Sequence, residues 1–450
     1  MVADDRAGGG HALLKVATAG SVDDGKSTLI GRLLYDTKSI LEDQLAAVER
    51  HSAQRGHDDV NLALLTDGLR SERDQGITID VAYRYFATPR RSFVLIDTPG
   101  HVQYTPNMVT GASNADVAVV LIDARKGVLE QSRRHASIAA LLAIPHVVLA
   151  VNKMDLVGWD QGVLAEITDR FGELAAGLGI PDVAVIPLSA LAGDNVVEPS
   201  TLMPWYDGPT LLEYLETLDV ASSHNLHDPR FPVQYVILSA NGRLGDERRY
   251  AGEVAGGVLR PGDPALVLPS GLRTTITELH TVDGPLAEAG PGQAVSLRLA
   301  DELDVERGDM VIVAGRGVEP MVTSEVAADV CWFVDRPLVA GARYTMKHTT
   351  RSVRAVVTEV TSRLDLDSLT PHPAQALAFN EIGEVTLHTS SPLVVDPYLR
   401  NRVTGRFILI DEATNSTAGA GMILPAGQER LSYTTRYDSS GRGQGPNRHP

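Results

Sequence analysis

The stretch from Gly20 to Ser27 has the spacing G-x-x-x-x-G-K-S, and it lies between the apolar run Leu13–Ala19 and the helical pattern Leu29–Leu34. Glycines in this spacing let backbone N–H groups turn inward around a phosphate, as no residue with a Cβ could. A glycine-rich turn without a ligand is the alternative for the spacing alone. The run before it and the helical pattern after it favour a phosphate-binding loop between a strand and a helix.

The end of this loop carries the groups that phosphates and a cation need. We expect Lys26 to reach the β- and γ-oxygens of a nucleotide and the Ser27 hydroxyl to ligate Mg²⁺. The residues expected to bind the phosphates are Gly20, Ser21, Val22, Asp23, Asp24, Gly25, Lys26, Ser27 and Thr28.

A second element, Asp-Thr-Pro-Gly, follows the apolar run Phe93–Ile96. We expect Asp97 to hold Mg²⁺ through a water and the Gly100 N–H to meet the γ-phosphate, a contact that hydrolysis removes. An Asp-initiated turn is the alternative for the tetrapeptide alone. Thr78 is the expected second hydroxyl ligand of Mg²⁺, although a strand with Ile77 on its other face is also open.

A third element, Asn-Lys-Met-Asp, follows the apolar run Val147–Val151. The Asp155 carboxylate can accept both N1–H and the amino group of guanine, and adenine offers neither donor there. We expect Asn152 and Lys153 to bind the nucleotide with it. Past the next strand, the backbone of Ser189, Ala190 and Leu191 suits guanine O6. The three elements in this order predict a GTP-dependent switch.

Short apolar runs alternate with helical patterns as far as Asp219, which predicts a doubly wound α/β domain with a mainly parallel sheet. The expected strands are Leu13–Ala19, Phe93–Ile96, Val117–Ile122, Val147–Val151 and Val183–Leu188, with helices at Ser132–Leu142 and Gly162–Leu178. After Phe231, β-rich segments separated by turns predict two β-barrels. We expect a disordered N-terminus (1–10), a GTPase domain (11–220), a linker (221–230), barrels at 231–317 and 318–430, and a disordered tail (431–450).

Composition limits the function classes. The net charge of −17 disfavours a nucleic-acid-binding surface. The nearest basic cluster is Arg351, Arg354 and Arg363, which we interpret as solvated charges on a strand. One cysteine, Cys331, and no secretory signal or membrane-length apolar segment indicate a cytoplasmic protein.

His101, directly after Asp-Thr-Pro-Gly, resembles the histidine of the translation-factor GTPases such as elongation factor Tu. The resemblance covers nearly the whole chain, as a GTPase domain followed by two β-barrels. It implies that His101 positions the attacking water and that Val22 and Ile77 form an apolar gate around it. Positioning and Mg²⁺ suffice for phosphoryl transfer to water.

The chain is more similar to the GTPase subunit of heterodimeric bacterial sulfate adenylyltransferase, in Asp24–Lys38, Gln75–Phe86, Asn380–Gly383 and Thr404–Asp411. This resemblance implies a smaller catalytic subunit that binds ATP and sulfate and makes adenosine 5′-phosphosulfate and pyrophosphate in sulfate assimilation. The pattern S-G-G-x-D-S is absent, so we do not expect adenylation on this chain alone. We expect a heterodimer or a higher assembly, without nucleic acid or membrane.

Two positions depart from that family's pattern. Val102 stands where the family tends to have glutamate, and Pro106 where it has arginine. Pro106 suits the first turn of a helix, with Thr105 as its cap, but a partner contact made by the arginine would be lost. The alternative function is a translation factor that binds aminoacyl-tRNA. The acidic charge and the stretches after Asn380 favour the sulfate adenylyltransferase subunit.

Overall fold

The computed structural model of the chain describes residues 13–21, 23–40, 62, 81–99, 104–180, 182–220, 225–238, 248–365 and 370–426. The described residues form two compact units. The first unit ends at Val220, and the second holds the described residues after it.

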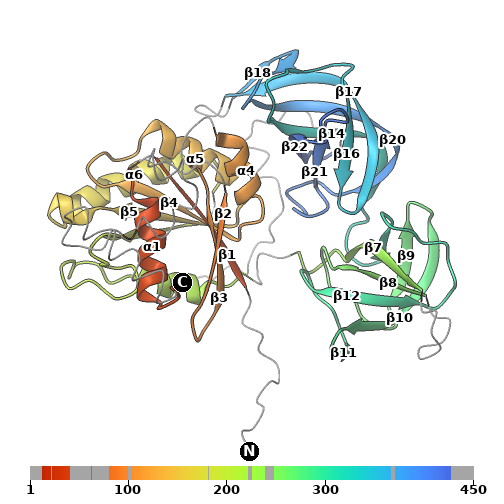
Figure 1. Cartoon of the computed structure of the whole chain (residues 1–450), viewed down its shortest axis with the longest axis horizontal. Helices are drawn as coiled ribbons and strands as arrows, with labels where there is room; N and C mark the ends of the chain where they lie inside the picture. Colours follow the sequence, from red (N-terminus) through yellow and green to blue (C-terminus); the bar gives the residue numbers. More distant parts are fainter. Residues whose placement is uncertain are drawn as a thin grey trace, which may run out of the picture. The chain divides into compact units, whose positions relative to one another are not determined.

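The first unit is a six-stranded sheet with helices on both faces (Figure 1). The strands are β1 (Leu14–Gly20), β2 (Ala82–Ala87), β3 (Ser92–Asp97), β4 (Val117–Asp123), β5 (His146–Asn152) and β6 (Val183–Pro187). The helices are α1 (Lys26–Asp36), α4 (Thr105–Ala112), α5 (Glu130–Leu141), the 3-10 helix η3 (Met154–Val157), α6 (Gln161–Gly177) and α7 (Leu211–Thr217). In the order β2-β3-β1-β4-β5-β6, only β2 is antiparallel to its neighbour.

The core of this unit has two layers, one on each face of the sheet. Alternate residues of β4 enter different layers: Val119 packs on the side of α1 and α7, and Val120 on the side of α5 and α6. A strand buried on both faces has no polar alternation. The sequence therefore shows it as a continuous apolar run, and the prediction of a doubly wound α/β domain is confirmed.

One detail of the first unit differs from expectation. Helix α4 already includes Thr105, and its N-cap is Tyr104, which makes no side-chain capping hydrogen bond. The expectation that Thr105 caps this helix is therefore wrong. A proline is accepted at either of the first two helical positions, because those N–H groups need no intrahelical partner. Pro106 alone could not locate the helix start to one residue.

The second unit consists of two antiparallel sheets, each closed into a barrel, as predicted (Figure 1). The first barrel comprises β7 (Arg230–Leu238), β8 (Arg248–Glu253), β9 (Pro264–Leu268), β10 (Leu272–Thr281), β11 (Gly284–Pro285), β12 (Ala294–Leu299) and β13 (Met310–Val313). The other comprises β14 (Met321–Trp332), β16 (Arg343–His348), β17 (Arg351–Leu364), β18 (Pro371–Pro373), β20 (Ile382–Val395), β21 (Arg406–Ile410) and β22 (Thr417–Ile423). The pairs β9–β10 and β16–β17 close the two sheets, and β15 (Leu338–Val339) pairs with β19 (Ala376–Leu377).

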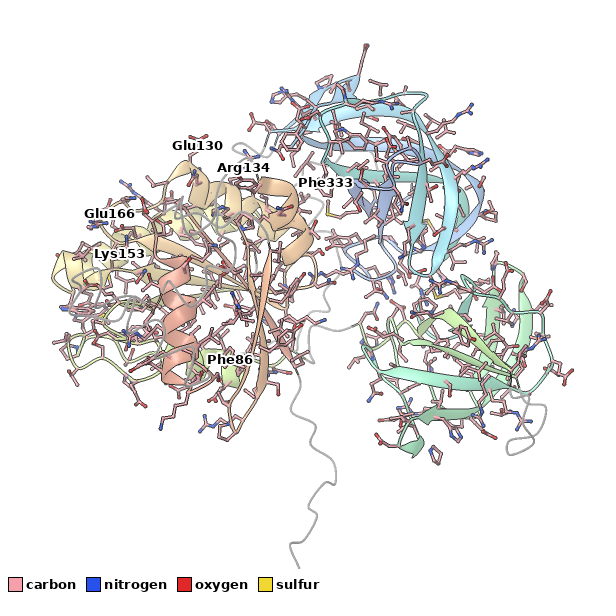
Figure 2. The ribbon with its side chains drawn as sticks, viewed as in Figure 1. Phe86, Glu130, Arg134, Lys153, Glu166 and Phe333 are labelled. Carbon is pink, nitrogen blue, oxygen red and sulfur yellow. The ribbon has the colours of Figure 1, made fainter. Side chains whose placement is uncertain are left out.

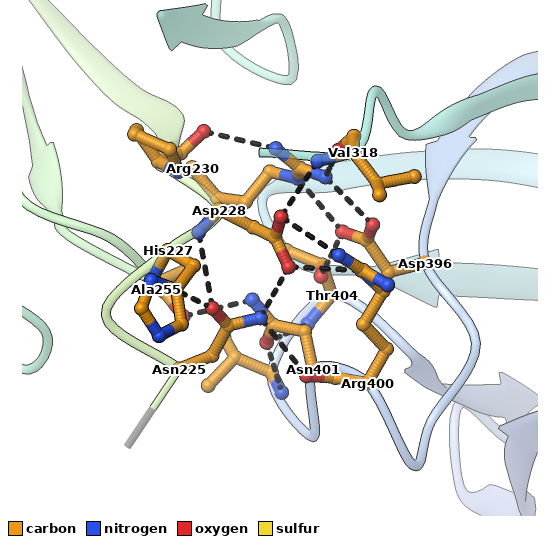
Figure 3. Close-up of polar contacts among 12 residues, drawn as sticks. Asn225, His227, Asp228, Arg230, Ala255, Val318, Asp396, Arg400, Asn401 and Thr404 are labelled. Carbon is orange, nitrogen blue, oxygen red and sulfur yellow. Dashed lines mark hydrogen bonds and ion pairs between the residues drawn. The ribbon is translucent and has the colours of Figure 1, made fainter. Parts of the chain in front are cut away.

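A buried polar network joins the two barrels (Figure 3). Arg230, the first residue of β7, donates from Nε and Nη2 to the two carboxylate oxygens of Asp396, both at 2.9 Å. Their side chains are 1% and 2% exposed. The Thr404 hydroxyl donates to Asp396 at 2.6 Å, and Arg400 pairs with Asp228 beside it. The Arg230–Asp396 ion pair joins the first barrel to the second, and the Thr404 hydroxyl holds the Asp396 carboxylate in place. These contacts hold the two barrels together as one unit.

The basic residues singled out in the sequence lie along β17, and each faces a carboxylate. Arg351 pairs with Asp309 at 3.6 Å, Arg354 with Glu412 at 3.7 Å, and Arg363 with Glu381 at 2.7 Å. Paired surface arginines do not form a concentrated positive field for nucleic acid. No helix among the described residues is long and apolar enough to span a bilayer.

We expect Gly383→Ala to destabilise the second barrel. Gly383 lies in β20, and a Cβ built there would be 2.1 Å from the carbonyl oxygen of Ser362, a backbone atom that cannot rotate away. Strain of this kind costs about 1–3 kcal/mol. Urea unfolding should show it, with Gly290→Ala as control, because a Cβ at Gly290 meets no atom within 4 Å. An equally stable Gly383→Ala variant would contradict the close packing of β20 on β17.

Candidate functional site

The loop between β1 and α1 lies at the edge of the sheet where the parallel strands end. Gly25 has a φ of 94° and is the N-cap residue of α1. A Cβ on Gly25 would be 2.4 Å from Nδ2 of Asn152. Glycine is therefore needed here for its left-handed backbone and for the close approach of the next motif.

Lys26 and Asp97 are in direct contact. The Lys26 ammonium donates to Oδ1 of Asp97 at 2.5 Å, and the two side chains are 8% and 4% exposed. Thr98 fixes the end of β3 by donating from its hydroxyl to the Thr18 carbonyl at 2.7 Å. The structure thus brings together the first two elements that the sequence predicted to share a site.

Asn152 connects the third element to the other loops. Its Nδ2 donates to the Asp24 carbonyl at 2.7 Å, and its Oδ1 accepts from the N–H groups of Lys153 at 2.8 Å and Ala190 at 2.9 Å. The side chain is 2% exposed. One amide therefore ties the phosphate loop, the Asn-Lys-Met-Asp element and the Ser189–Leu191 segment into a single edge.

Lys153 (Figure 2) adds a second link between the same loops. Its ammonium donates to the Asp23 carbonyl and, at 3.0 Å, to the carboxylate of Asp123 at the end of β4. Arg125 also bonds Asp123, at 3.0 and 2.6 Å. Burial alone would raise the pKa of Asp123, but the hydrogen bonds from Arg125 and Lys153 outweigh it and hold that pKa well below its ordinary value.

The remaining residues predicted to bind the guanine base follow the ends of β5 and β6. Asp155 is half-buried in the first turn of η3, and Ser189 is fully buried while Leu191 is 60% exposed. Arg32 of α1 donates to the carbonyls of Ala190 at 3.2 Å and Leu191 at 2.5 Å. Helix α1 therefore holds both the phosphate loop at its start and the Ser189–Leu191 segment along its side.

Sequence reasoning missed Asp123 and Arg32 as parts of this site. Asp123 directly follows a buried strand, as Asp97 does, so its position was a usable signal. Arg32 carries no comparable signal, because its partners lie 158 and 159 residues away in the sequence.

The residues present fit a magnesium ion. Ser27 follows Lys26 in the first turn of α1, and Lys26 contacts Asp97, so a hydroxyl and a carboxylate stand at the same loop. Hard oxygen donors of this kind, completed by phosphates and waters, are the ligands that Mg²⁺ prefers. Several predicted site residues lie outside the described residues: Val22, Ile77, Thr78, Gly100 and His101, together with Val102 and the side chain of Pro106.

Comparisons with known proteins agree with this organisation. The family model for the elongation factor Tu GTP binding domain matches residues 11–221, and the GTP-eEF1A C-terminal domain-like model matches residues 325–424. Sulfate adenylyltransferase subunit 1 of Laribacter hongkongensis is 50% identical over 416 residues, which are 92% of this chain and 85% of that protein. The bifunctional enzyme CysN/CysC of Mycobacterium tuberculosis is 57% identical over 414 residues, 92% of this chain and 67% of that protein.

The fold, together with the loops that Asn152 joins, defines the class of protein: a GTP-binding domain of the elongation factor Tu type followed by two β-barrels. Within this class, the relatives from Laribacter hongkongensis and Yersinia enterocolitica, at 50% and 49% identity, are both named sulfate adenylyltransferase subunit 1. The chain belongs to the sulfate adenylyltransferase subunit 1 family. The resemblance inferred from the sequence is thereby confirmed.

Proposed function

We propose that this chain binds GTP with Mg²⁺ and couples its hydrolysis to the formation of adenosine 5′-phosphosulfate and pyrophosphate from ATP and sulfate. The adenylation itself takes place on a smaller partner subunit. The observation that supports this most is the junction at Asn152, which joins the phosphate loop to the guanine-reading elements in a chain of this family.

In this mechanism the phosphates of the nucleotide and the Asp97 carboxylate compete for the Lys26 ammonium group. The phosphates of GTP draw the Lys26 ammonium away from Asp97, which leaves the Asp97 carboxylate free to support the ion. Ser27 and Thr78 would hold Mg²⁺ through their hydroxyl groups, and the bound ion would supply positive charge beside the phosphates. Asp155 reads the guanine edge, and the loop N–H groups from Gly20 to Thr28 cradle the phosphates.

The need for a second nucleotide follows from the product. The phosphate–sulfate anhydride formed is higher in energy than the bond broken in ATP, so adenylation alone lies uphill. Hydrolysis of GTP changes that balance only if the GTP and GDP states bind the partner differently. The contact between the Gly100 N–H and the γ-phosphate would provide such a difference, because hydrolysis removes it.

We expect His101→Ala to reduce GTP turnover and to leave GTP affinity nearly unchanged, because the proposed role of His101 is to position the attacking water. General acid–base or positioning groups typically contribute about 10²–10⁴-fold to a rate. Single-turnover hydrolysis and equilibrium binding of a non-hydrolysable analogue separate the two effects. Equal losses in both would instead indicate a structural histidine.

The function as a whole is tested by the response of GTP hydrolysis to a partner. We expect slow hydrolysis by the purified chain and faster hydrolysis when the catalytic subunit, ATP and sulfate are added together. Tight binding of aminoacyl-tRNA, with no response to the catalytic subunit, would support the translation-factor alternative.

A further inference from the structure

Arg32 of helix α1 binds the backbone of the loop that follows β6. Its Nε donates to the Ala190 carbonyl at 3.2 Å, and its Nη2 donates to the Leu191 carbonyl at 2.5 Å. The third nitrogen, Nη1, pairs with Asp36 one helical turn later at 3.4 Å. The Arg32 side chain is 18% exposed, so these contacts are partly shielded from water. A planar guanidinium can hold two carbonyls and a carboxylate at once in a fixed geometry, which the ammonium of a lysine cannot do.

The N–H groups of the same loop, residues 189–193, are used within the protein with one exception. Those of Ser189, Ala190, Ala192 and Gly193 donate in turn to the Asp194 carbonyl at 3.1 Å, Oδ1 of Asn152 at 2.9 Å, the Ser189 hydroxyl at 3.2 Å and the Ser189 carbonyl at 2.7 Å. The exception is the Leu191 N–H, which donates to no group in the described part of the chain. Leu191 therefore offers the one N–H of this loop that a ligand can take without breaking a bond of the fold.

The contact between Arg32 and Ala190 also sets the direction of this N–H. The Ala190 carbonyl and the Leu191 N–H belong to the same trans peptide unit, in which the two groups lie in one plane and point in opposite directions. Because Arg32 holds the carbonyl, the N–H points away from the guanidinium. Arg32 also holds the Leu191 carbonyl of the next peptide unit, so rotation of the first unit would break two hydrogen bonds. The free donor is therefore fixed in direction before a ligand binds.

We propose that Arg32 is a positioning residue for base recognition: it holds the Ala190 and Leu191 carbonyls and thereby aims the Leu191 N–H at O6 of a bound guanine. O6 is a carbonyl oxygen and accepts a hydrogen bond, whereas adenine carries an amino group at that position, which is a donor. The contact therefore adds to the discrimination against adenine that Asp155 supplies from another edge of the base. The proposal rests on the proposed binding of a guanine nucleotide and adds a residue that determines its specificity.

Replacing O6 by sulfur tests the contact. The nucleotide 6-thio-GDP keeps the N1–H, the amino group and the phosphates of GDP, but its sulfur is a weak acceptor. Wild-type protein should bind GDP about tenfold more tightly than 6-thio-GDP at neutral pH, as expected for the loss of one hydrogen bond. In Arg32→Met this preference should fall to about threefold or less, mainly through weaker binding of GDP. Methionine keeps an unbranched side chain in α1 but donates no hydrogen bond.

Two further variants control for effects on the fold. Asp36→Asn weakens the ion pair with Arg32 and leaves both carbonyl contacts in place, so it should prefer GDP over 6-thio-GDP as strongly as wild type. Arg32→Lys keeps the positive charge without the planar fork and should lose part of the preference. If Arg32→Met does not fold, Arg32→Lys takes its place, and a preference equal to wild type would then overturn the proposal.

The outcomes distinguish the inference from the function on which it rests. Equal weakening of GDP and 6-thio-GDP in Arg32→Met would show that Arg32 supports only the fold of the loop, and it would overturn the proposal. Equal affinity of the wild-type protein for the two nucleotides would overturn the contact between Leu191 and O6. If the wild-type protein binds no GDP at all, the proposed function fails instead.

Discussion

Asp155→Asn is expected to lose most of its affinity for GTP and to gain affinity for XTP. In its proposed role the Asp155 carboxylate accepts two hydrogen bonds from guanine, whereas an asparagine amide can donate to the oxygen that xanthine carries in place of the guanine amino group. Losing charge-assisted bonds of this kind costs about 3 kcal/mol, which is roughly 100-fold in affinity.

The position of Asp155 in the structure allows this substitution without a change of fold. Asp155 lies in the first turn of η3 and is only half-buried, so an isosteric amide there leaves the fold intact. Asp169→Asn, on an exposed position of α6, is the matched control and should bind GTP like wild type. Competition of GTP and XTP for a fluorescent nucleotide measures both affinities. Unchanged GTP affinity in Asp155→Asn would remove Asp155 from base recognition.

Asp396→Ala is expected to lower the free energy of unfolding of the barrel unit by about 3–5 kcal/mol, because it leaves Arg230 charged, buried and unpaired. The two side chains are 1% and 2% exposed and share two hydrogen bonds at 2.9 Å. The network of Figure 3 offers Arg230 no second carboxylate at hydrogen-bond distance.

Two further variants distinguish the effect of an unpaired buried charge on Arg230 from a simple loss of packing. The double variant Arg230→Met, Asp396→Leu should recover much of the loss, since apolar replacements of buried ion pairs are often neutral or better. Glu288→Ala breaks the exposed Arg260–Glu288 pair and should change stability little. Urea midpoints measure all three proteins. An Asp396→Ala variant as stable as Glu288→Ala would show that the buried pair does not join the barrels.

Much of the first unit was predictable because its strands are buried on both faces. Each of the five predicted strands has a counterpart within one or two residues, since short apolar runs such as Val117–Ile122 are typical of strands buried on both faces. Strand β2 was missed: its Tyr83 and Tyr85 are exposed, and an edge strand of mixed polarity lacks both the apolar run and the full alternation.

The order of motifs predicted which loops meet, but not how they are joined. Asn152 was expected to bind the nucleotide, and that role stays a prediction; in the structure its amide holds the loops of Asp24 and Ala190. The ion pair of Arg230 with Asp396 spans 166 residues. Such a contact forms only once both barrels have closed, so no local sequence pattern predicts which two residues pair.

The measurement that tests the coupling most directly is the final yield of adenosine 5′-phosphosulfate made by the assembled chain and catalytic subunit, with and without GTP. The comparison uses the same ATP and sulfate and includes a non-hydrolysable GTP analogue. Coupling predicts that GTP raises the yield above the level reached without it, and that the analogue does not. A final yield unaffected by GTP would contradict the account.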